Sequence, residues 1–373
     1  MSSSIIVDVV KSKKDLKEFI NFPWKIYKND PNWVPPLKDE VKKMLDTKKN
    51  PFWEHARREL FIARRDKDVV GRIAAIIDPF HNERHNDKVG FFGFFECIND
   101  KSVSSALFDK AAEWLKQQGC DRMRGPLSPS MNDEIGFLLE GFNSPPVLMM
   151  SYTPPYYLDL AKDWGLVKVK DLYAFFKDAT KGINERVERL IEKIKERTHV
   201  EIRSFDMKNF KRDVGIIKDL YNRAWEKNWG AVPMTEKEMD ALAENLKTMC
   251  EPELIKFAFI NGEPVGLSVV LPNINEIIKD FNGNMNIFNM IRFLINKKKI
   301  KGVRALIFGF IEGYRQTGLP LVLYYETEKS GRKLGYEWVE LSWNLEDNDL
   351  INKFDEMVGA HIYKKYRICE KPI

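Results

Sequence analysis

The sequence predicts a mixed α/β protein in which one unit of strands and helices occurs twice. Three pairs of matching segments support this prediction, and they follow one another in the same order in each half of the chain. Each half has two strands joined by a polar turn, then a strand–helix–strand passage, then a helix, a glycine and closing strands. Independent matches in one order indicate a duplication.

The antiparallel strand pairs come first in each copy. They read "ARRDKDVVGRIAAII" at 63–77 and "AFINGEPVGLSVVL" at 258–271. In both, two apolar runs flank a polar turn, and the second run opens with Val-Gly. This pattern predicts a hairpin of two strands.

The strand–helix–strand passages start at Phe92 and Phe308, where "FGFFE" matches "FGFIE". A stretch with helical spacing follows in both copies. When Phe92 is laid on Phe308, Gly119 falls on Gly335 without a gap, and each glycine predicts the end of a helix. A second strand then follows in each copy.

The closing segments read "YYLDLAKDWGLVKVKDLYAFF" at 156–176 and "INKFDEMVGAHIYKKYRIC" at 351–369. Each predicts a helix, a glycine stop and strands. Strands joined both by tight turns and by helices predict a mixed sheet in each copy.

A charged helical stretch separates the two copies. We therefore expect an N-terminal domain at 1–177, a linker helix at 178–199 and a C-terminal domain at 200–373. The second copy has extra residues within 273–302, which end in the basic run "INKKKIKGVR". A solvated hairpin is the ordinary interpretation of such a run, and contact with a phosphate or an acidic partner is the alternative.

Composition narrows the possible functions. The chain has 373 residues with a formal charge of +5, which does not indicate a nucleic-acid binder. Its four cysteines have no paired spacing for zinc or redox chemistry. The N-terminus lacks the pattern of a signal peptide, and no apolar run is long enough to span a bilayer. We therefore expect a cytoplasmic protein without a membrane partner, as a monomer or homodimer.

The second copy resembles the signature region of the GNAT acetyltransferase superfamily. The residues that carry the resemblance are "GFIEGYRQTGLPLVLYYETEKSGRKLGYEWVELSWNLEDN", a strand, a loop with Arg-x-x-Gly, a helix and a strand. The phrases "DRMRGPLSPSMNDEIG", "YNRAWEKNWGAVP" and "ELSWNLEDND" are similar to the YghO-like group of bacterial acetyltransferases. The resemblance implies two tandem GNAT (acyl-CoA N-acyltransferase) domains and N-acetyltransferase activity.

The resemblance also implies that the C-terminal copy binds acetyl-CoA or another acyl-CoA. Unpaired N–H groups at the start of a helix suit a phosphate, and an arginine adds a fixed cation. The residues implied in cofactor binding are Phe310, Ile311, Arg315, Gln316, Thr317, Gly318, Leu319, Asn344 and Asn348. Asn348 is alternatively a helix cap.

Two departures from the family pattern concern this loop. Pro320 stands where a glycine or alanine is usual, so one N–H donor is lost, although proline suits the first turn of a helix. In the first copy Asn99–Ser102 replace Arg315–Gly318, and Asp100 would repel a pyrophosphate. We expect the N-terminal copy to have lost cofactor binding and to shape the substrate site.

The catalytic residues implied are Glu340 as general base and Tyr366 as general acid. Glu340 is alternatively a strand carboxylate paired with a lysine. Many GNAT enzymes have a tyrosine acid four residues before the glycine that ends the last helix, and here that position holds Asp355. Tyr363 or Tyr366 would then replace the missing acid. The strand must also part from its parallel neighbour around Glu340–Asn344 to admit the cofactor.

Four residues are candidates for substrate binding: Asn132, Asp133, Glu134 and Trp229. The first three follow a strand of the first copy, where loops face the cleft, and a capped turn is the alternative. Trp229 would form an aromatic wall or a core contact. His81 and His85 are four residues apart, but without a third ligand we expect no metal site.

These observations predict direct transfer of an acetyl or other acyl group from acyl-CoA to the amine of a small molecule or peptide. Two alternatives remain open. One is a non-catalytic CoA or ligand sensor, and the other is an aminoacyl or fatty-acyl transferase on the same tandem fold.

Overall fold

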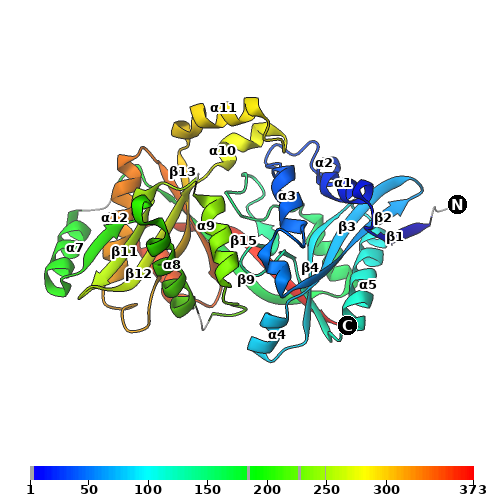
Figure 1. The fold of residues 1–373 in the computed structure, drawn as a ribbon, viewed down its shortest axis with the longest axis horizontal. Coiled ribbons are helices and arrows are strands. Elements are labelled where there is room, and N and C mark those ends of the chain that lie inside the picture. The colour runs from blue at the N-terminus through cyan, green and yellow to red at the C-terminus, as the bar shows by residue number, and fades with distance from the viewer. Residues whose placement is uncertain (1–3, 183–184, 226–227, 248) are drawn as a thin grey trace.

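A computed structural model describes residues 4–182, 185–225, 228–247 and 249–373. Most strands belong to one thirteen-stranded sheet that runs the length of the molecule (Figure 1). The strands are β1 (Ile5–Val9), β2 (Arg57–Arg65), β3 (Asp68–Ile77), β4 (Val89–Cys97), β5 (Arg122–Gly125), β6 (Leu127–Ser128), β7 (Glu134–Ile135), β8 (Phe137–Glu140), β9 (Val167–Asp178), β10 (Glu201–Ser204), β11 (Ile255–Ile260), β12 (Glu263–Pro272), β13 (Gly302–Phe310), β14 (Trp338–Leu345) and β15 (His361–Pro372).

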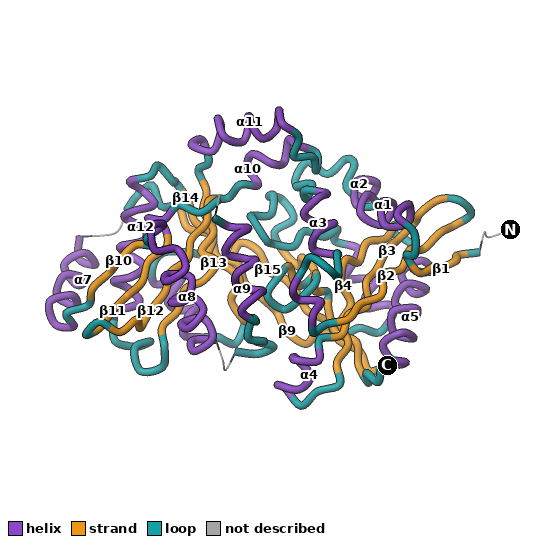
Figure 2. Tube along the Cα trace, in the orientation of Figure 1, coloured by secondary structure: helices purple, strands orange, loops and turns teal. Residues whose placement is uncertain are grey.

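Helices pack on the faces of this sheet and along its edges (Figure 2). They are α1 (Lys13–Asn21), α2 (Pro23–Ile26), α3 (Lys38–Leu45), α4 (Pro79–His85), α5 (Lys101–Gln117), α6 (Tyr156–Trp164), α7 (Glu185–Thr198), α8 (Phe210–Trp225), α9 (Glu236–Leu246), α10 (Asn275–Ile278), α11 (Ile287–Asn296), α12 (Leu319–Lys333) and α13 (Asp349–Met357).

The strand order has an approximate mirror pattern. It runs β1-β2-β3-β4-β5-β15-β9-β14-β13-β12-β11-β10. Among the described residues, each half has one parallel pair, which joins the strand before the long helix to the strand after it: β4 with β5, and β13 with β14. The prediction of a mixed sheet built from the same unit twice is therefore confirmed.

The closing strand of each half pairs with the other half. Strand β15, which closes the second half, pairs antiparallel with β5 of the first half, with Cys369 opposite Gly125. Correspondingly, β9 pairs with β14 of the second half, with Leu341 opposite Phe175. The two closing strands also pair with each other at the centre. The backbone hydrogen bonds of the sheet thus continue without a break from one half to the other.

The predicted linker at 178–199 contains α7, which begins after β9 and ends before β10. Its inner face holds Ile191 and Ile194, which are buried in a cluster with Leu319 and Val322 of α12. The helix is therefore packed on the second half of the molecule. The exact division of the chain into domains stays a prediction.

Helix α5 shows why the repeated helices form where they do. Val103, Leu107, Ala111 and Leu115 recur every fourth residue, and all four are fully buried against the sheet. Asp100 caps the helix by accepting a hydrogen bond from the backbone N–H of Ser102. An apolar stripe and a capping carboxylate together specify this helix.

The extra residues of the second copy form α10 and α11 at the top of the molecule in Figure 1. This insertion contacts the first half, because Trp24 Nε1 donates to Asn282 Oδ1 over 2.6 Å. The backbone N–H of Lys38 donates to Gly283 O over 2.9 Å. The insertion therefore bridges the two halves.

We expect Asp213→Ala to lower the free energy of unfolding by about 2–3 kcal/mol at neutral pH. Asp213 is fully buried, and its carboxylate accepts hydrogen bonds from Arg203, Arg212 and the backbone N–H of Asp206. Burial raises the pKa of Asp213, but the arginine hydrogen bonds outweigh it and hold this pKa below its ordinary value. Urea unfolding at several pH values measures the effect.

The sign of its pH dependence follows from the lowered pKa. The contribution of Asp213 is present above about pH 4, where the unfolded carboxyl is ionised, and is lost as the pH falls through the lower folded value. Asp219→Ala is the control, since its exposed pair with Arg223 contributes no more than about 0.5 kcal/mol. Equal effects of the two substitutions would contradict the argument.

Candidate active site

The parallel strands β13 and β14 part from each other midway along their length. Their pairing runs from Gly302 opposite Trp338 to Ala305 opposite Leu341 and ends there. Beyond that point β13 continues to Phe310 and β14 to Leu345. Register shifts in the pairing of each strand with its other neighbour lie close to this point. The expected parting of the strands is present.

A cavity of about 340 Å³ lies at this opening. Residues 306–310 of β13 line it, together with residues of β14, α12 and α13. The first half and the segment around residues 228–234 also contribute. Most of the lining side chains are apolar or aromatic, among them Met131, Val232, Leu306, Leu341, Phe354, Trp229, Trp338 and Trp343. An elongated apolar substituent would therefore find contacts along the cavity.

The start of α12 lies next to the opening. Gly318 is its N-cap residue with a φ of 87°, a left-handed conformation that favours glycine, and no side chain caps the helix. Pro320 occupies the first turn and lines the cavity. The uncapped helix start offers its remaining N–H groups to an anion. Packing also favours glycine at position 318, since an added Cβ would lie 2.9 Å from Ile194 Cδ1.

Arg315 lines the cavity and connects the loop to the strand. Its Nε donates to Phe310 O over 3.0 Å, and its Nη2 donates to Ala224 O over 2.8 Å. A guanidinium has five N–H donors, so these two bonds orient Arg315 and leave further donors. The loop, the uncapped helix and Arg315 together fit a pyrophosphate.

The corresponding place in the first half is closed. Asp100 stands at the start of α5, where its carboxylate accepts from Ser102 and from Arg65 Nη2 over 2.6 Å. The hydrogen bonds from Arg65 and Ser102 lower the pKa of Asp100 to about 2. The opening between β4 and β5 is blocked as well, because a Cβ on Gly93 would lie 1.6 Å from Leu127 O. The carboxylate of Asp100 thus occupies the start of α5, and the backbone at Leu127 fills the space between β4 and β5.

A polar relay lies behind the wall of the cavity. Arg304 Nε donates to Ser342 Oγ over 3.1 Å, and Ser342 Oγ in turn donates to Glu340 Oε1. The other oxygen of Glu340 accepts from Tyr363 Oη. Arg304 and Ser342 line the cavity, whereas Glu340 is fully buried and lies outside the lining. Burial raises the pKa of Glu340 to about 7.

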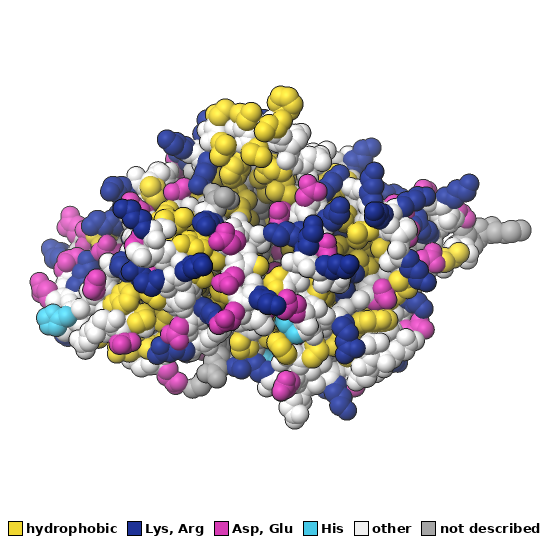
Figure 3. All heavy atoms as spheres, in the orientation of Figure 1, with side chains coloured by type: hydrophobic (Ala, Val, Ile, Leu, Met, Phe, Trp, Pro, Cys, Tyr) yellow, Lys and Arg dark blue, Asp and Glu magenta, His cyan; other side chains and the backbone are white. Residues whose placement is uncertain are grey.

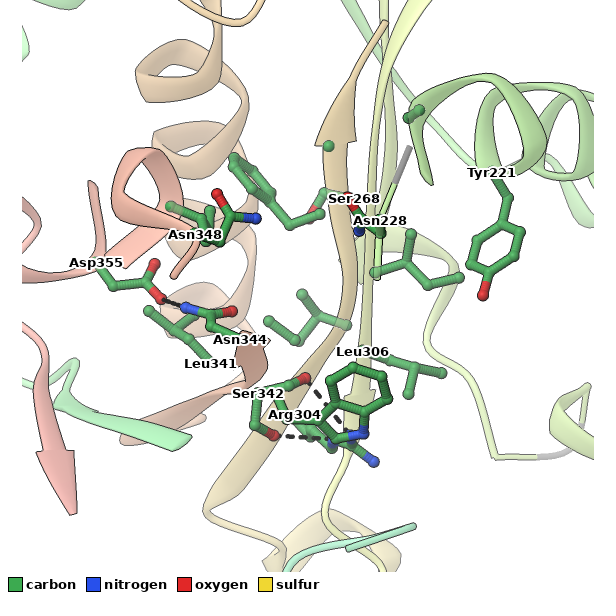
Figure 4. A pocket seen from close by; sticks show the side chains of 18 of the residues that line it. Tyr221, Asn228, Ser268, Arg304, Leu306, Leu341, Ser342, Asn344, Asn348 and Asp355 are labelled. Carbon is green, nitrogen blue, oxygen red and sulfur yellow. Dashed lines mark hydrogen bonds between the residues drawn. The ribbon is translucent and has the colours of Figure 1, made fainter. Parts of the chain in front are cut away.

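Asp355 lies on α13 at the cavity, on the same side as Asn348 (Figure 4). Asn344 Nδ2 donates to Asp355 Oδ2 over 2.7 Å. Asp355 is 3% exposed, and burial raises its pKa to about 7. A carboxyl group that keeps its proton near neutral pH can act as a general acid. The family pattern of a tyrosine acid predicts that the acid is missing at this position, whereas the buried carboxyl group of Asp355 can take that role.

The curated relatives match almost the whole chain. Protein YghO of Escherichia coli (strain K12) is 35% identical over 99% of this chain and 95% of its own length. The bacterial ceramide synthase of Caulobacter vibrioides (strain NA1000 / CB15N) is 34% identical over 100% of this chain and 98% of its own length. The chain belongs to the YghO family. No family model matches the sequence.

Two solved structures are similar to this member of the YghO family and identify its fold. A tandem GNAT protein from the clavulanic acid biosynthesis pathway covers 99% of this chain and 98% of its own, with a TM-score of 0.58 and 10% identity. A GCN5-related glucosamine N-acetyltransferase region of a fungal multi-domain β-N-acetylglucosaminidase matches with a TM-score of 0.60 and 14% identity. That match covers 100% of this chain and 38% of the fungal one. The fold is therefore the tandem GNAT fold.

The residues expected from the resemblance to this family divide into two groups. Phe310, Arg315, Asn344 and Asn348 line the cavity. Ile311, Gln316, Thr317, Gly318 and Leu319 are in the neighbouring loop and helix start, outside the lining; Gln316 is exposed and Leu319 is buried in the core. Their roles in cofactor binding stay predictions.

Tyr366, the expected acid, is 1% exposed and lies outside the cavity lining. Its hydroxyl has no hydrogen-bond partner among the described residues, and burial raises its pKa well above the ordinary value. Tyr363 is the tyrosine that contacts Glu340. The structure therefore places Tyr363, and not Tyr366, on the relay.

Three of the four expected substrate residues, Asn132, Asp133 and Glu134, come from the first half, and Trp229 comes from the second. Asn132, Asp133 and Trp229 line the cavity, and Asn132 Oδ1 accepts from Tyr221 Oη of α8 over 3.0 Å. Asp133 accepts from Ser130, and burial raises the pKa of Asp133 to about 6. Glu134 is exposed and lies outside the cavity lining.

Two further observations concern metals and membranes. Within the described ranges, no three His, Cys, Asp or Glu side chains are grouped so that they could bind a metal ion. None of the described helices has the length and apolar character needed to cross a bilayer.

Proposed function

We propose that this protein transfers a fatty-acyl or other acyl group from acyl-CoA to an amine held in the cavity, which forms an amide. The observation that carries the proposal is the opening between β13 and β14, which leads into a largely apolar cavity beside the uncapped start of α12. The backbone of β13 would pair with the amides of the pantetheine arm. Arg315 and the start of α12 would hold the pyrophosphate.

The lipid character of the substrates is supported by the cavity lining and by one relative. That relative is named a bacterial ceramide synthase, and a ceramide is an amide between a fatty acid and a long-chain amino alcohol. A cavity lined by apolar side chains from both halves suits a hydrocarbon chain better than a small polar amine. The acceptor that we propose is therefore a long-chain amine.

The reaction needs two proton transfers, and the residues at the cavity can supply both. The amine nitrogen attacks the thioester carbon, the C–N bond forms and the C–S bond breaks. The proton that the amine loses passes through Ser342 Oγ to Glu340, and Asp355 donates its proton to the departing thiolate. Both carboxyl groups have a pKa near 7, which suits these exchanges at neutral pH.

The test is turnover with two substrate panels. The purified protein is incubated with acyl-CoA donors of increasing chain length and with amines that range from small polar compounds to long-chain amino alcohols. Mass spectrometry then identifies any amide. We expect product with long-chain pairs. Product only with acetyl-CoA and small amines would refute the lipid assignment, and binding of acyl-CoA without any product would favour a non-catalytic sensor.

The sensor is the second candidate because of one observation at the helix start. Pro320 removes one N–H donor from the first turn of α12. This departure from the pattern of the active enzymes is compatible with a protein that binds CoA and does not catalyse a transfer. Turnover in the panels above separates the two candidates.

We expect Arg315→Ala to weaken acyl-CoA binding by about 10-fold to 100-fold, the range for losing a charged hydrogen bond. Arg315 lines the cavity next to the phosphate-binding helix start. Lys101→Ala is the matched control, because Lys101 belongs to the closed loop of the first half and is exposed. Calorimetric titration with an acyl-CoA measures both. A similar loss in both variants, or in neither, would contradict the assignment of the cofactor to the second half.

A further inference from the structure

The outward face of α11 is almost entirely apolar. Ile287, Phe288, Ile291, Leu294 and Ile295 follow helical spacing along one side, and Met290 lies beside them. Phe288 is 74% exposed, and Leu294 and Ile295 are each 67% exposed. Figure 3 shows hydrophobic side chains gathered at the top of the molecule, where Figure 1 has α11. We call this surface the α11 face. A surface helix normally turns its apolar side inward, so this orientation indicates a binding surface.

The helix is firmly held from below. A buried cluster of Val34, Ile274, Ile278, Phe281 and Ile300 supports the insertion, and Phe293 of α11 packs against it. Trp24 of the first half binds Asn282 at the base of the insertion. The apolar side chains of the α11 face are thus presented on a supported platform. The corresponding segment of the first copy, between β3 and β4, is shorter and holds only α4.

Basic residues border the α11 face. Lys297, Lys298 and Lys299 follow α11 directly, and Lys298 and Lys299 are exposed. Some neighbouring cations are partly neutralised: Lys297 pairs with Glu251, Arg292 with Asp280, and Lys301 with Glu337. Neither Lys298 nor Lys299 forms an ion pair with another residue in the described part of the chain, so the rim nearest the end of α11 keeps positive charge.

We propose that the α11 face docks this protein onto the surface of a lipid bilayer that contains anionic lipid. The helix would lie in the plane of the interface, with its apolar side chains among the acyl chains and its lysines at the headgroups. At ten residues it is about 15 Å long, too short to cross a bilayer.

A bilayer fits the α11 face better than a second copy of the chain. Hydrophobic side chains project there as a convex ridge at the top edge of the molecule (Figure 3). Such a ridge can enter a soft interface without a complementary groove. A symmetric contact between two α11 faces would bring no acidic side chain of α11 to these lysines, because the helix contains none. Anionic headgroups instead supply the opposite charge.

The location of the α11 face gives docking a use. Tyr336 packs in the cluster beneath α11 and also lines the cavity between β13 and β14. Docking would thus hold one end of the cavity near the bilayer, where long-chain substrates reside. This last step rests on the proposed function, whereas docking itself does not.

Vesicle flotation of the full-length protein, without any acyl donor or acceptor, tests the inference. We expect the wild type to float with phosphatidylcholine vesicles that contain phosphatidylglycerol, and to bind pure phosphatidylcholine more weakly. Phe288→Ser with Leu294→Ser should lower the partition at least about tenfold, because both side chains leave the bilayer interior. Lys298→Glu with Lys299→Glu should lower binding only to the anionic vesicles, and high salt should do the same.

Leu190→Ser is the matched control, since Leu190 is a half-exposed apolar residue on α7 far along the chain from α11. It should float as the wild type does. Circular dichroism should show unchanged folding in every variant, because all of these side chains are exposed. Wild type that fails to float, or α11 variants that float unchanged, would overturn the proposal. It would also be overturned if the wild type were a dimer that does not float and the Phe288/Leu294 variant were a monomer.

Discussion

Asp355→Asn lowers the kcat of amide formation by about 100-fold to 1000-fold, if the proposed acid role is correct, because the variant cannot donate a proton to the thiolate. The substitution keeps the shape of the side chain, and its carbonyl oxygen can still accept the hydrogen bond from Asn344. Binding of acyl-CoA should therefore be nearly unchanged. Steady-state kinetics with saturating substrates, together with calorimetry, measures both quantities.

The pH profile separates this role from a structural one. In the wild type, kcat should fall as the pH rises through about 7, because Asp355 then loses the proton that it must donate. This fall should be absent from the residual activity of the variant. Since a buried carboxylate costs stability once it is ionised, Asp355→Asn should not lower the thermal midpoint at pH 8. A variant with full kcat, or one with an unchanged pH profile, would remove Asp355 from the mechanism.

Arg304→Ala lowers the free energy of unfolding by about 3–5 kcal/mol, the range for breaking a buried charge network. Arg304 is 3% exposed and donates to Leu148 O and Met149 O of the first half as well as to Ser342 of β14. Its loss leaves the carbonyl groups unpaired and Glu340 without its nearest cation. Urea unfolding at neutral pH measures the change.

Arg292→Ala is the control for this substitution. Arg292 is half-exposed and lies 3.9 Å from Asp280, so its removal should cost about 0.5 kcal/mol or less. Adding Glu340→Gln to Arg304→Ala should recover part of the loss, because the buried carboxylate is then neutral. Arg304→Ala within about 1 kcal/mol of the wild type would show that the network contributes little.

The repeated unit could be predicted from sequence because its signals are local. Strand pairs around polar turns, helical spacing and glycine stops each depend on a few neighbouring residues, and two copies in one order reinforce each other. The exchange of β9 and β15 could not be predicted in this way. The residue patterns of β9 and β15 would suit pairing with either β5 or β14. Only packing across the whole molecule determines that β9 pairs with β14 and β15 with β5.

The candidate site shows the same division. The loop with Arg315 and Gly318 was identified from its motif, and the parting of β13 from β14 was expected from the resemblance. The relay through Ser342 and the raised pKa of Asp355 depend on burial, which one sequence does not reveal. The sequence predicts a solvated hairpin for the basic run after residue 296. In the structure this run directly follows α11, whose exposed side is apolar.

The exchange of closing strands has a consequence for biosynthesis. Residues 361–372 form the strand that lies against β5, so the sheet of the first half stays incomplete until nearly all of the described chain has left the ribosome. In many multidomain proteins the first domain folds during translation and so shields its core early. Here the edge strand β5 of the first half stays unpaired until β15 has been synthesised. Until then it can pair with a wrong strand of the same chain or of another chain. The order of synthesis therefore makes this protein a candidate client for chaperones that protect nascent β-sheet edges.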